Sequence, residues 1–155
     1  MIRIYACRKP ADSMIYKHSA LHFECTHCGA CCQGGDEHYV AINRADLTRI
    51  RRYLGISEAW LKRRYVRFFS PSFYTLRFTD KNHCVFLNRD NTCRIYAVRP
   101  VQCRTYPWWP ELLASKKAWH QEARRCEGID NGKRVAVNRI IASLRQQLAF
   151  EEDSE

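Results

Sequence analysis

The sequence has no long apolar run: no stretch reaches the roughly 18 consecutive apolar residues that mark a membrane-spanning helix. Residues 1–8 also lack the apolar core of a secretory signal. Acidic residues are few, since 16 Asp and Glu stand against 26 Lys and Arg, and the net charge is +10. We therefore expect a basic, cytoplasmic protein with no membrane anchor. The alternative location is the mitochondrial matrix, because the first eleven residues hold three cations and no acid.

The composition is that of a folded chain, with 46% hydrophobic and 12% aromatic residues. A length of 155 residues is too short for a nucleotide-binding fold joined to a separate substrate domain. Four acids fall in the last five residues. We predict a single cysteine-rich metal-binding domain over residues 1–150, followed by an acidic, disordered tail over 151–155.

Nine cysteines are more than an ordinary soluble domain of this size contains. Their number is odd and no export signal precedes them, which argues against a disulfide framework. Four of them fall within the eight residues 25–32, whereas cysteines that only fill a core would be scattered. This clustering predicts metal ligands. The nine are Cys7, Cys25, Cys28, Cys31, Cys32, Cys84, Cys93, Cys103 and Cys126.

The spacing of the first cluster favours an iron–sulfur centre over zinc. Cys25-x2-Cys28-x2-Cys31 matches the first three ligands of bacterial ferredoxins, which bind [4Fe–4S] clusters. A structural zinc site more often shows separated cysteine pairs. Zinc stays open, because isolated C-x2-C pairs serve both metals. Cys32 is either a ligand or a thiol packed beside the site.

A second block of cysteines follows downstream. Residues 88–92 have the composition of a turn between two apolar runs, so we expect a hairpin that brings Cys84 and Cys93 towards each other. Pro100 then starts a short helical turn that carries Cys103. Cys126 lies further along, shortly before Gly128.

These blocks together resemble the YkgJ-like family, whose members are described as zinc- or iron-chelating and share a C-x2-C-x2-C-C signature. A related cysteine cluster occurs in the flagellin lysine methylase. The resemblance spans roughly residues 23–128. The motifs that carry it are Phe23-x-Cys25-x2-Cys28-Gly29-x-Cys31-Cys32, Cys84-x-Phe86-Leu87 and Cys93-x-Ile95-Tyr96-x2-Arg99-Pro100-x2-Cys103-Arg104-x-Tyr106-Pro107.

The resemblance implies a set of metal ligands made of eight cysteines. Glu127 stands where the family pattern has proline, directly after Cys126. Cys7 lies outside the pattern, so we expect Cys7 to be a spare thiol. Arg99, Arg104 and Tyr106 flank Cys103, and we expect them around the thiolates, where cations stabilise the negative charge. The implied ligands are Cys25, Cys28, Cys31, Cys32, Cys84, Cys93, Cys103 and Cys126.

Residues 43–67 form a strongly basic stretch, with eight cations and two acids. It has the pattern of two short helices, the first capped by Asn43 and ending at Gly55, the second capped by Ser57. The cations lie off the apolar stripes. They form either a solvated surface or a surface that binds nucleic acid or another large anionic partner. The residues expected on it are Arg49, Arg51, Arg52, Lys62, Arg63 and Arg64.

The chain as a whole predicts a small α+β domain built around cysteine-ligated metal. Short strands are expected at 39–42 and 73–79, followed by the hairpin at 84–96. A helix is expected over 110–123. A last, amphipathic helix is expected over 133–150, with Val137, Ile141, Leu144 and Leu148 on its apolar face.

The expected function is metal binding, with iron–sulfur ahead of zinc, in which the metal supports the fold and redox or ligand chemistry. One alternative is a zinc-stabilised, non-enzymatic module that uses its basic surface. Another follows from the methylase resemblance: a cluster-dependent enzyme that transfers methyl groups from S-adenosylmethionine. The sequence has no G-x-G-x-x-G-like loop for such a cofactor, so whether the protein is an enzyme stays open.

Overall fold

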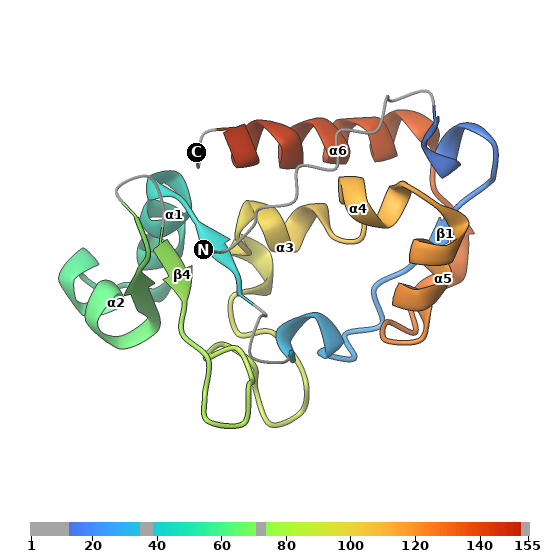
Figure 1. Ribbon diagram of the computed structural model, residues 1–155. Coiled ribbons are helices and arrows are strands. Elements are labelled where there is room, and N and C mark those ends of the chain that lie inside the picture. The colour runs from blue at the N-terminus through green and yellow to red at the C-terminus, as the bar shows by residue number, and fades with distance from the viewer. Residues whose placement is uncertain (1–12, 35–38, 71–73, 153–155) are drawn as a thin grey trace. The chain divides into compact units, whose positions relative to one another are not determined.

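The computed structural model describes residues 13–34, 39–70 and 74–152. Cys7 and residues 153–155 lie outside them. The described chain is α+β, as predicted, with short strands and helices and a C-terminal helix (Figure 1). None of the helices in these ranges is both long enough and apolar enough to cross a membrane. Two compact units form, one from Met1–Thr26 and Thr105–Leu148 and one from His27–Arg104 and Ala149–Glu155.

The first unit combines a two-stranded sheet with helices. Strand β1 (His22–Phe23) pairs antiparallel with β5 (Ile129–Arg134). The pairing joins Phe23 to Ile129 and His22 to Arg134, so β5 bulges between these points, where Gly132 has a φ of 78°. The other elements are the 3-10 helix η2 (Ile15–Lys17), the helices α4 (Pro110–Leu113) and α5 (Lys116–Ala123), and most of α6 (Val137–Glu152).

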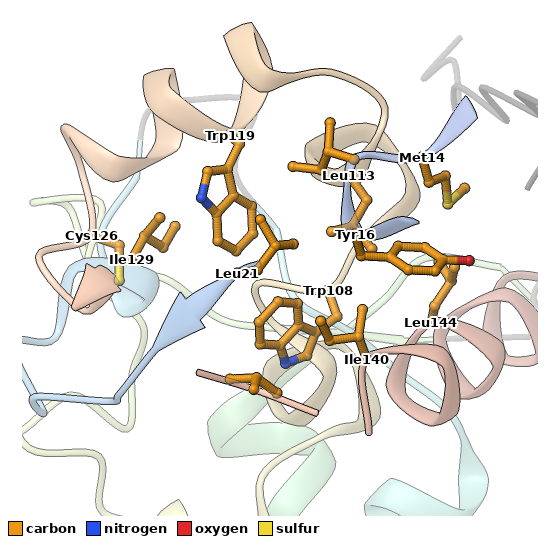
Figure 2. Close-up of a cluster of buried hydrophobic side chains, with 12 residues drawn as sticks. Met14, Tyr16, Leu21, Trp108, Leu113, Trp119, Cys126, Ile129, Ile140 and Leu144 are labelled. Carbon is orange, nitrogen blue, oxygen red and sulfur yellow. The ribbon is translucent and has the colours of Figure 1, made fainter. Parts of the chain in front are cut away.

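The core of the first unit is built around two tryptophans (Figure 2). The rings of Trp108 and Trp119 stack with centroids 5.6 Å apart. Trp119 Nε1 donates a hydrogen bond of 2.7 Å to Asp130 Oδ1, so the one polar atom of this buried ring has a partner. Ile140 and Leu144 contribute from α6. This core ties α5, β5 and α6 together.

The second unit is a three-stranded antiparallel sheet with two helices (Figure 1). Its strand order is β2 (Ala41–Ile42), β4 (Tyr74–Leu76), β3 (Val66–Phe68). Helices α1 (Arg44–Leu54) and α2 (Glu58–Tyr65) lie between β2 and β3 in the chain. The remaining short helices are η3 (Ala30–Cys32), η4 (Tyr96–Val98) and α3 (Val101–Thr105), which ends in the first unit.

Local sequence signals explain the helix ends in the second unit. The Asn43 side chain accepts the N–H of Asp46, and the Asp46 carboxylate accepts the N–H of Asn43, which is a capping box. Gly55 ends α1 with a φ of 65°, and Ser57 caps α2 by accepting the N–H of Trp60. The two helices predicted for this stretch are therefore present with their predicted caps.

Other boundaries differ from the sequence prediction. The helix expected over 110–123 is two helices, because Ser115 caps a new start by accepting the N–H of Ala118. Residues 129–134 form β5, so the last helix begins at Val137. That helix ends at Glu152, two residues into the predicted tail.

The apolar face of α6 also differs from the prediction. Ile140, Leu144 and Gln147 are buried, whereas Val137 and Leu148 are exposed. The face of α6 that packs on the core therefore runs through Ile140, Leu144 and Gln147. The predicted stripe included Leu144 and the half-buried Ile141 correctly, but its two ends face solvent.

Candidate metal centre

Two loops of the second unit carry four of the predicted ligands. The first turns at Gly29, which has a φ of 75° and stands at the start of η3. The N–H of Cys32 donates to the Gly29 carbonyl (2.9 Å), which closes the turn that presents Cys31 and Cys32. A Cβ placed on Gly29 would lie 2.8 Å from the carbonyl oxygen of Asn91. The residue must be glycine both for its φ and for this close approach to the second loop.

The second loop, which spans residues 84–93, is attached to the first by its backbone. The N–H of Cys84 donates to the carbonyl of Cys32 (2.7 Å). The loop turns as the sequence predicted, with a bridge between Leu87 and Cys93 and a bond of 2.9 Å from the Arg94 N–H to the Phe86 carbonyl. Cys84 and Cys93 are thereby held on the side that faces Cys32.

Five thiols gather where these loops meet. The Cys32 thiol is hydrogen-bonded with the thiols of Cys31, Cys84 and Cys93. Cys103, on α3, lies close enough to Cys84, Cys31 and Cys93 for their charges to act on it. The surroundings are apolar, with Phe86 and Ile95 each about 1% exposed. We call Cys31, Cys32, Cys84, Cys93 and Cys103 the five-thiol group.

The thiols of the group differ in pKa. The hydrogen bond with Cys32 lowers the pKa of Cys93 to about 7, and the Ile95 N–H and the charge of Arg99 act in the same direction. The pKa of Cys32 is raised, chiefly by its hydrogen bonds with Cys31, Cys84 and Cys93. Burial raises the pKa of Cys103, and the neighbouring thiols raise it further. Cys93 is therefore the most readily ionised thiol among these three.

The donor chemistry of the five-thiol group fits a thiophilic metal. None of the eight described cysteines is in a disulfide, so all are available as thiols. Sulfur-only ligand sets select zinc or iron–sulfur centres. In the described ranges, no three His, Cys, Asp or Glu side chains are arranged to hold a metal ion, and the Cys32 thiol is hydrogen-bonded with its three neighbours. Metal binding would replace these hydrogen bonds and release their protons.

Two further predicted ligands belong to the first unit. Cys126 is 6% exposed and lies at the edge of the tryptophan core beside Ile129 (Figure 2). The Glu24 N–H donates to the Gly128 carbonyl (3.1 Å), so the segments that carry Cys25 and Cys126 run side by side. Cys28 belongs to the second unit and is half-buried, and the described contacts do not join it to the five-thiol group.

Of the residues expected around the thiolates, Arg99 lies in the second unit near Cys93. Its guanidinium lies 3.7 Å from the centre of the Tyr96 ring, and its Nε donates to the Tyr96 carbonyl (3.1 Å). Arg104 has Arg49, Asp46 and Arg99 as its charged neighbours. Arg104 therefore belongs to a charged group beside α1.

Tyr106 belongs to the first unit, with Cys126. Its hydroxyl donates to Glu122 Oε1 (2.7 Å). Burial raises its pKa, as do Glu122 and then Cys126, so the phenol is neutral. The Tyr106 hydroxyl is thus a hydrogen-bonding neighbour of the Cys126 thiol.

The predicted basic surface separates into inner and outer cations. Arg49 is bound to the buried carboxylate of Asp46 and donates to the Arg99 carbonyl (3.2 Å). Arg51 is half-buried, and Lys62 is paired with Glu58 at 2.6 Å. Arg52, Arg63 and Arg64 are exposed. Two aromatic residues of the same stretch, Trp60 and Phe68, are also exposed, and the sequence prediction of this surface did not include them.

A curated relative and a family model resemble this chain. An uncharacterized protein of Methanocaldococcus jannaschii is 33% identical over 99 residues, which cover 63% of this chain and 51% of that protein. The chain thus spans about half the length of this relative. No solved structure matches. A family model described as "Putative zinc- or iron-chelating domain" matches residues 24–127, the range that holds all eight predicted ligands, and the chain therefore belongs to this CxxCxxCC family.

Proposed function

We propose that the five-thiol group is the metal centre of this protein and that the metal is an iron–sulfur cluster. The observation that supports this most directly is the gathering of five thiols, none of them in a disulfide, in one apolar part of the second unit. Membership of a zinc- or iron-chelating family supports the binding of a metal of one of these two kinds. Cys25, Cys28 and Cys126 stay predicted ligands from the family pattern.

Two features support iron over zinc. The chain has the Cys25-x2-Cys28-x2-Cys31 spacing of cluster-binding ferredoxins, of which Cys31 lies in the five-thiol group. The group is also sulfur-only, whereas zinc sites often include histidine. Here the His27 ring lies against Tyr96, with centroids 4.5 Å apart. Zinc remains the competing metal, because four thiolates satisfy its tetrahedral preference.

The protein's own residues would prepare the site for either metal. Arg99 and the Ile95 N–H favour the thiolate of Cys93, which is the form that binds metal. Phe86 and Ile95 give the group an apolar shell, and Cys32 and Cys84 are buried from water. A cluster, when bound, would supply one-electron chemistry, and its potential would depend on these neighbours.

The test is anaerobic purification followed by measurement of iron, acid-labile sulfide and zinc per chain, with a visible absorption spectrum. Iron and sulfide in equal amounts, about four of each for one cluster, are the expected result. Zinc without sulfide would overturn the iron–sulfur assignment and leave metal binding intact.

Single substitutions test the ligand assignment. Cys84→Ala and Cys93→Ala should each lose metal, whereas Cys7→Ala, outside the family pattern, should retain it. Because metal binding contributes to folding, the first two variants should also unfold at lower denaturant. Full metal content in both Cys84→Ala and Cys93→Ala would show that the centre lies elsewhere.

A further inference from the structure

The backbone aligns two cysteines of the five-thiol group across the two loops that carry them. Gln33 and His83 form an antiparallel bridge. On one side of this bridge, the Cys84 N–H donates to the Cys32 carbonyl over 2.7 Å. Cys32 and Cys84 are therefore directly opposite each other in an antiparallel pair. Opposed residues that share a backbone hydrogen bond have Cα atoms about 5.5 Å apart and side chains on the same face.

This arrangement of Cys32 and Cys84 matches what a disulfide requires. Bridged cysteines usually have Cα atoms about 4.4–6.8 Å apart and side chains that point towards each other. The two side chains meet the second condition, because their thiols are hydrogen-bonded. A bond between the two sulfurs would therefore need little movement of the backbone.

The other thiols bonded to Cys32 are less well placed for a bridge. Cys31 is its neighbour in the chain, and a disulfide between neighbours would strain the peptide group between them. Cys93 is hydrogen-bonded with Cys32 through its side chain, but its backbone is bridged to Leu87 within the second loop. The register of the backbone therefore selects Cys84 as the partner of Cys32.

We propose that Cys32 and Cys84 form a reversible disulfide when the metal is absent, and that this disulfide prevents the metal from binding. The inference rests on the proposed function, because it takes the five-thiol group as the metal centre. With a peroxide as the oxidant, one thiol takes up an oxygen atom as a sulfenic acid, and one water is released. The second thiol then attacks that sulfur, the S–S bond forms and a second water leaves. The two cysteines together lose two hydrogen atoms, and the peroxide is reduced to water.

The disulfide and the metal exclude each other because they use the same sulfur atoms. Thiophilic metals bind thiolates, and a disulfide has no thiolate to offer. Joining Cys32 to Cys84 leaves three thiols in the group, whereas tetrahedral zinc and a [4Fe–4S] cluster each need a fourth ligand. Oxidation thus closes the centre, and a dithiol that reduces the bond by exchange reopens it.

The experiment compares the full chain in two forms, metal-free after treatment with a chelator and loaded with Zn²⁺. Zn²⁺ is the probe because it binds thiolates without added sulfide. Both forms are treated with hydrogen peroxide, the remaining thiols are blocked with N-ethylmaleimide, and the peptides are mapped by mass spectrometry. The metal-free chain should give a peptide pair joined through Cys32 and Cys84, and bound Zn²⁺ should suppress this product. The oxidised chain should lose its uptake of Zn²⁺ and regain it after treatment with dithiothreitol.

Two variants test the pairing within the same group. Cys84→Ser removes one sulfur of the proposed bridge and should abolish the joined peptide in the metal-free chain. Cys103→Ser is the matched control, because it removes a thiol of the group and leaves both partners of the bridge in place. It should give the same joined peptide as the original chain. Circular dichroism reports whether each variant is folded, and the map of the original chain decides the pairing if Cys84→Ser is not.

Three results would overturn the inference. The first is a disulfide from Cys32 to Cys93 in place of Cys84, and the second is the absence of any disulfide after peroxide treatment. The third is an oxidised chain that binds as much Zn²⁺ as the reduced chain. Failure of the proposed function looks different: a reduced chain that binds neither zinc nor iron would remove the metal centre, while the peptide map would still decide whether Cys32 pairs with Cys84.

Discussion

At the residue scale, Gly29 is the position on which the metal centre most depends apart from the thiols themselves. Its φ is 75°, and a Cβ added to it would lie only 2.8 Å from the Asn91 carbonyl oxygen. Gly55 has a similar φ of 65° but open space around its Cα. The two glycines therefore separate the cost of an unfavourable backbone from the cost of a steric clash.

Gly29→Ala should lower the free energy of unfolding by about 2–3 kcal/mol and also reduce metal content, since the clash pushes apart the loops that carry Cys32 and Cys84. Gly55→Ala should cost about 1 kcal/mol and leave metal content unchanged. Urea unfolding and metal analysis of both variants measure this. A Gly29→Ala protein that is no less stable than Gly55→Ala would show that the two loops do not pack as described.

The residue types at the centre could be recognised from the sequence, but their grouping could not. Four cysteines within eight residues indicate a metal, and a turn at 88–92 indicates that Cys84 and Cys93 approach each other. Nothing local shows that Cys32 meets both of them, because that contact depends on the backbone bond from Cys84 to Cys32, 52 positions apart in the numbering. The same limit applies to Arg49, which looks like a surface cation until its buried partner is known.

At the element scale, helix α1 is fixed by more than its capping box. The Asp46 side chain is fully buried, and its carboxylate accepts the N–H groups of Asn43 and Val101 in addition to the Arg49 guanidinium. Burial is the largest influence on this carboxyl and raises its pKa, while these three donors oppose that shift. One carboxylate thus joins α1 to the start of α3, the helix that carries Cys103.

Asp46→Ala should destabilise the protein by about 2–3 kcal/mol, because it removes a cap and leaves buried donors and the Arg49 charge without an acceptor. Ser57→Ala, which removes the exposed cap of α2, should cost about 1 kcal/mol. Denaturant unfolding of the two variants gives the comparison. Equal costs would mean that Asp46 acts only as a cap and does not join α1 to α3.

The elements that the sequence predicted well are those with local signals. Asn43, Gly55 and Ser57 determine where α1 and α2 begin and end, and each was recognised. Strand β5 was missed, because Ile129–Arg134 has no alternating pattern and its partner β1 lies more than 100 residues earlier. The apolar face of α6 was misplaced for the same reason: the tryptophan core, not the helix, decides which stripe is buried.

At the scale of the whole molecule, the two compact units carry different parts of the predicted ligand set. The five-thiol group belongs entirely to the second unit, while Cys25 and Cys126 belong to the first. Each unit has its own core, one around Trp108 and Trp119 and one around Phe86 and Ile42. A metal held by the five-thiol group should therefore stabilise the second unit more than the first.

Metal removal tests this directly by amide hydrogen exchange with and without a chelator. A metal that binds only the folded site stabilises the segment that forms the site. This stabilisation is about 4 kcal/mol when the concentration of free metal is a thousand times its Kd. Protection should fall most at the amide of Cys84, which donates to the first loop, and at the amide of Arg94, which closes the second loop. The amides of Glu24 and Val135, which hold β1 against the segment around β5, should change less. Greater loss at Glu24 and Val135 would instead place the metal with Cys25 and Cys126, because local opening follows the unit that has lost its ligand.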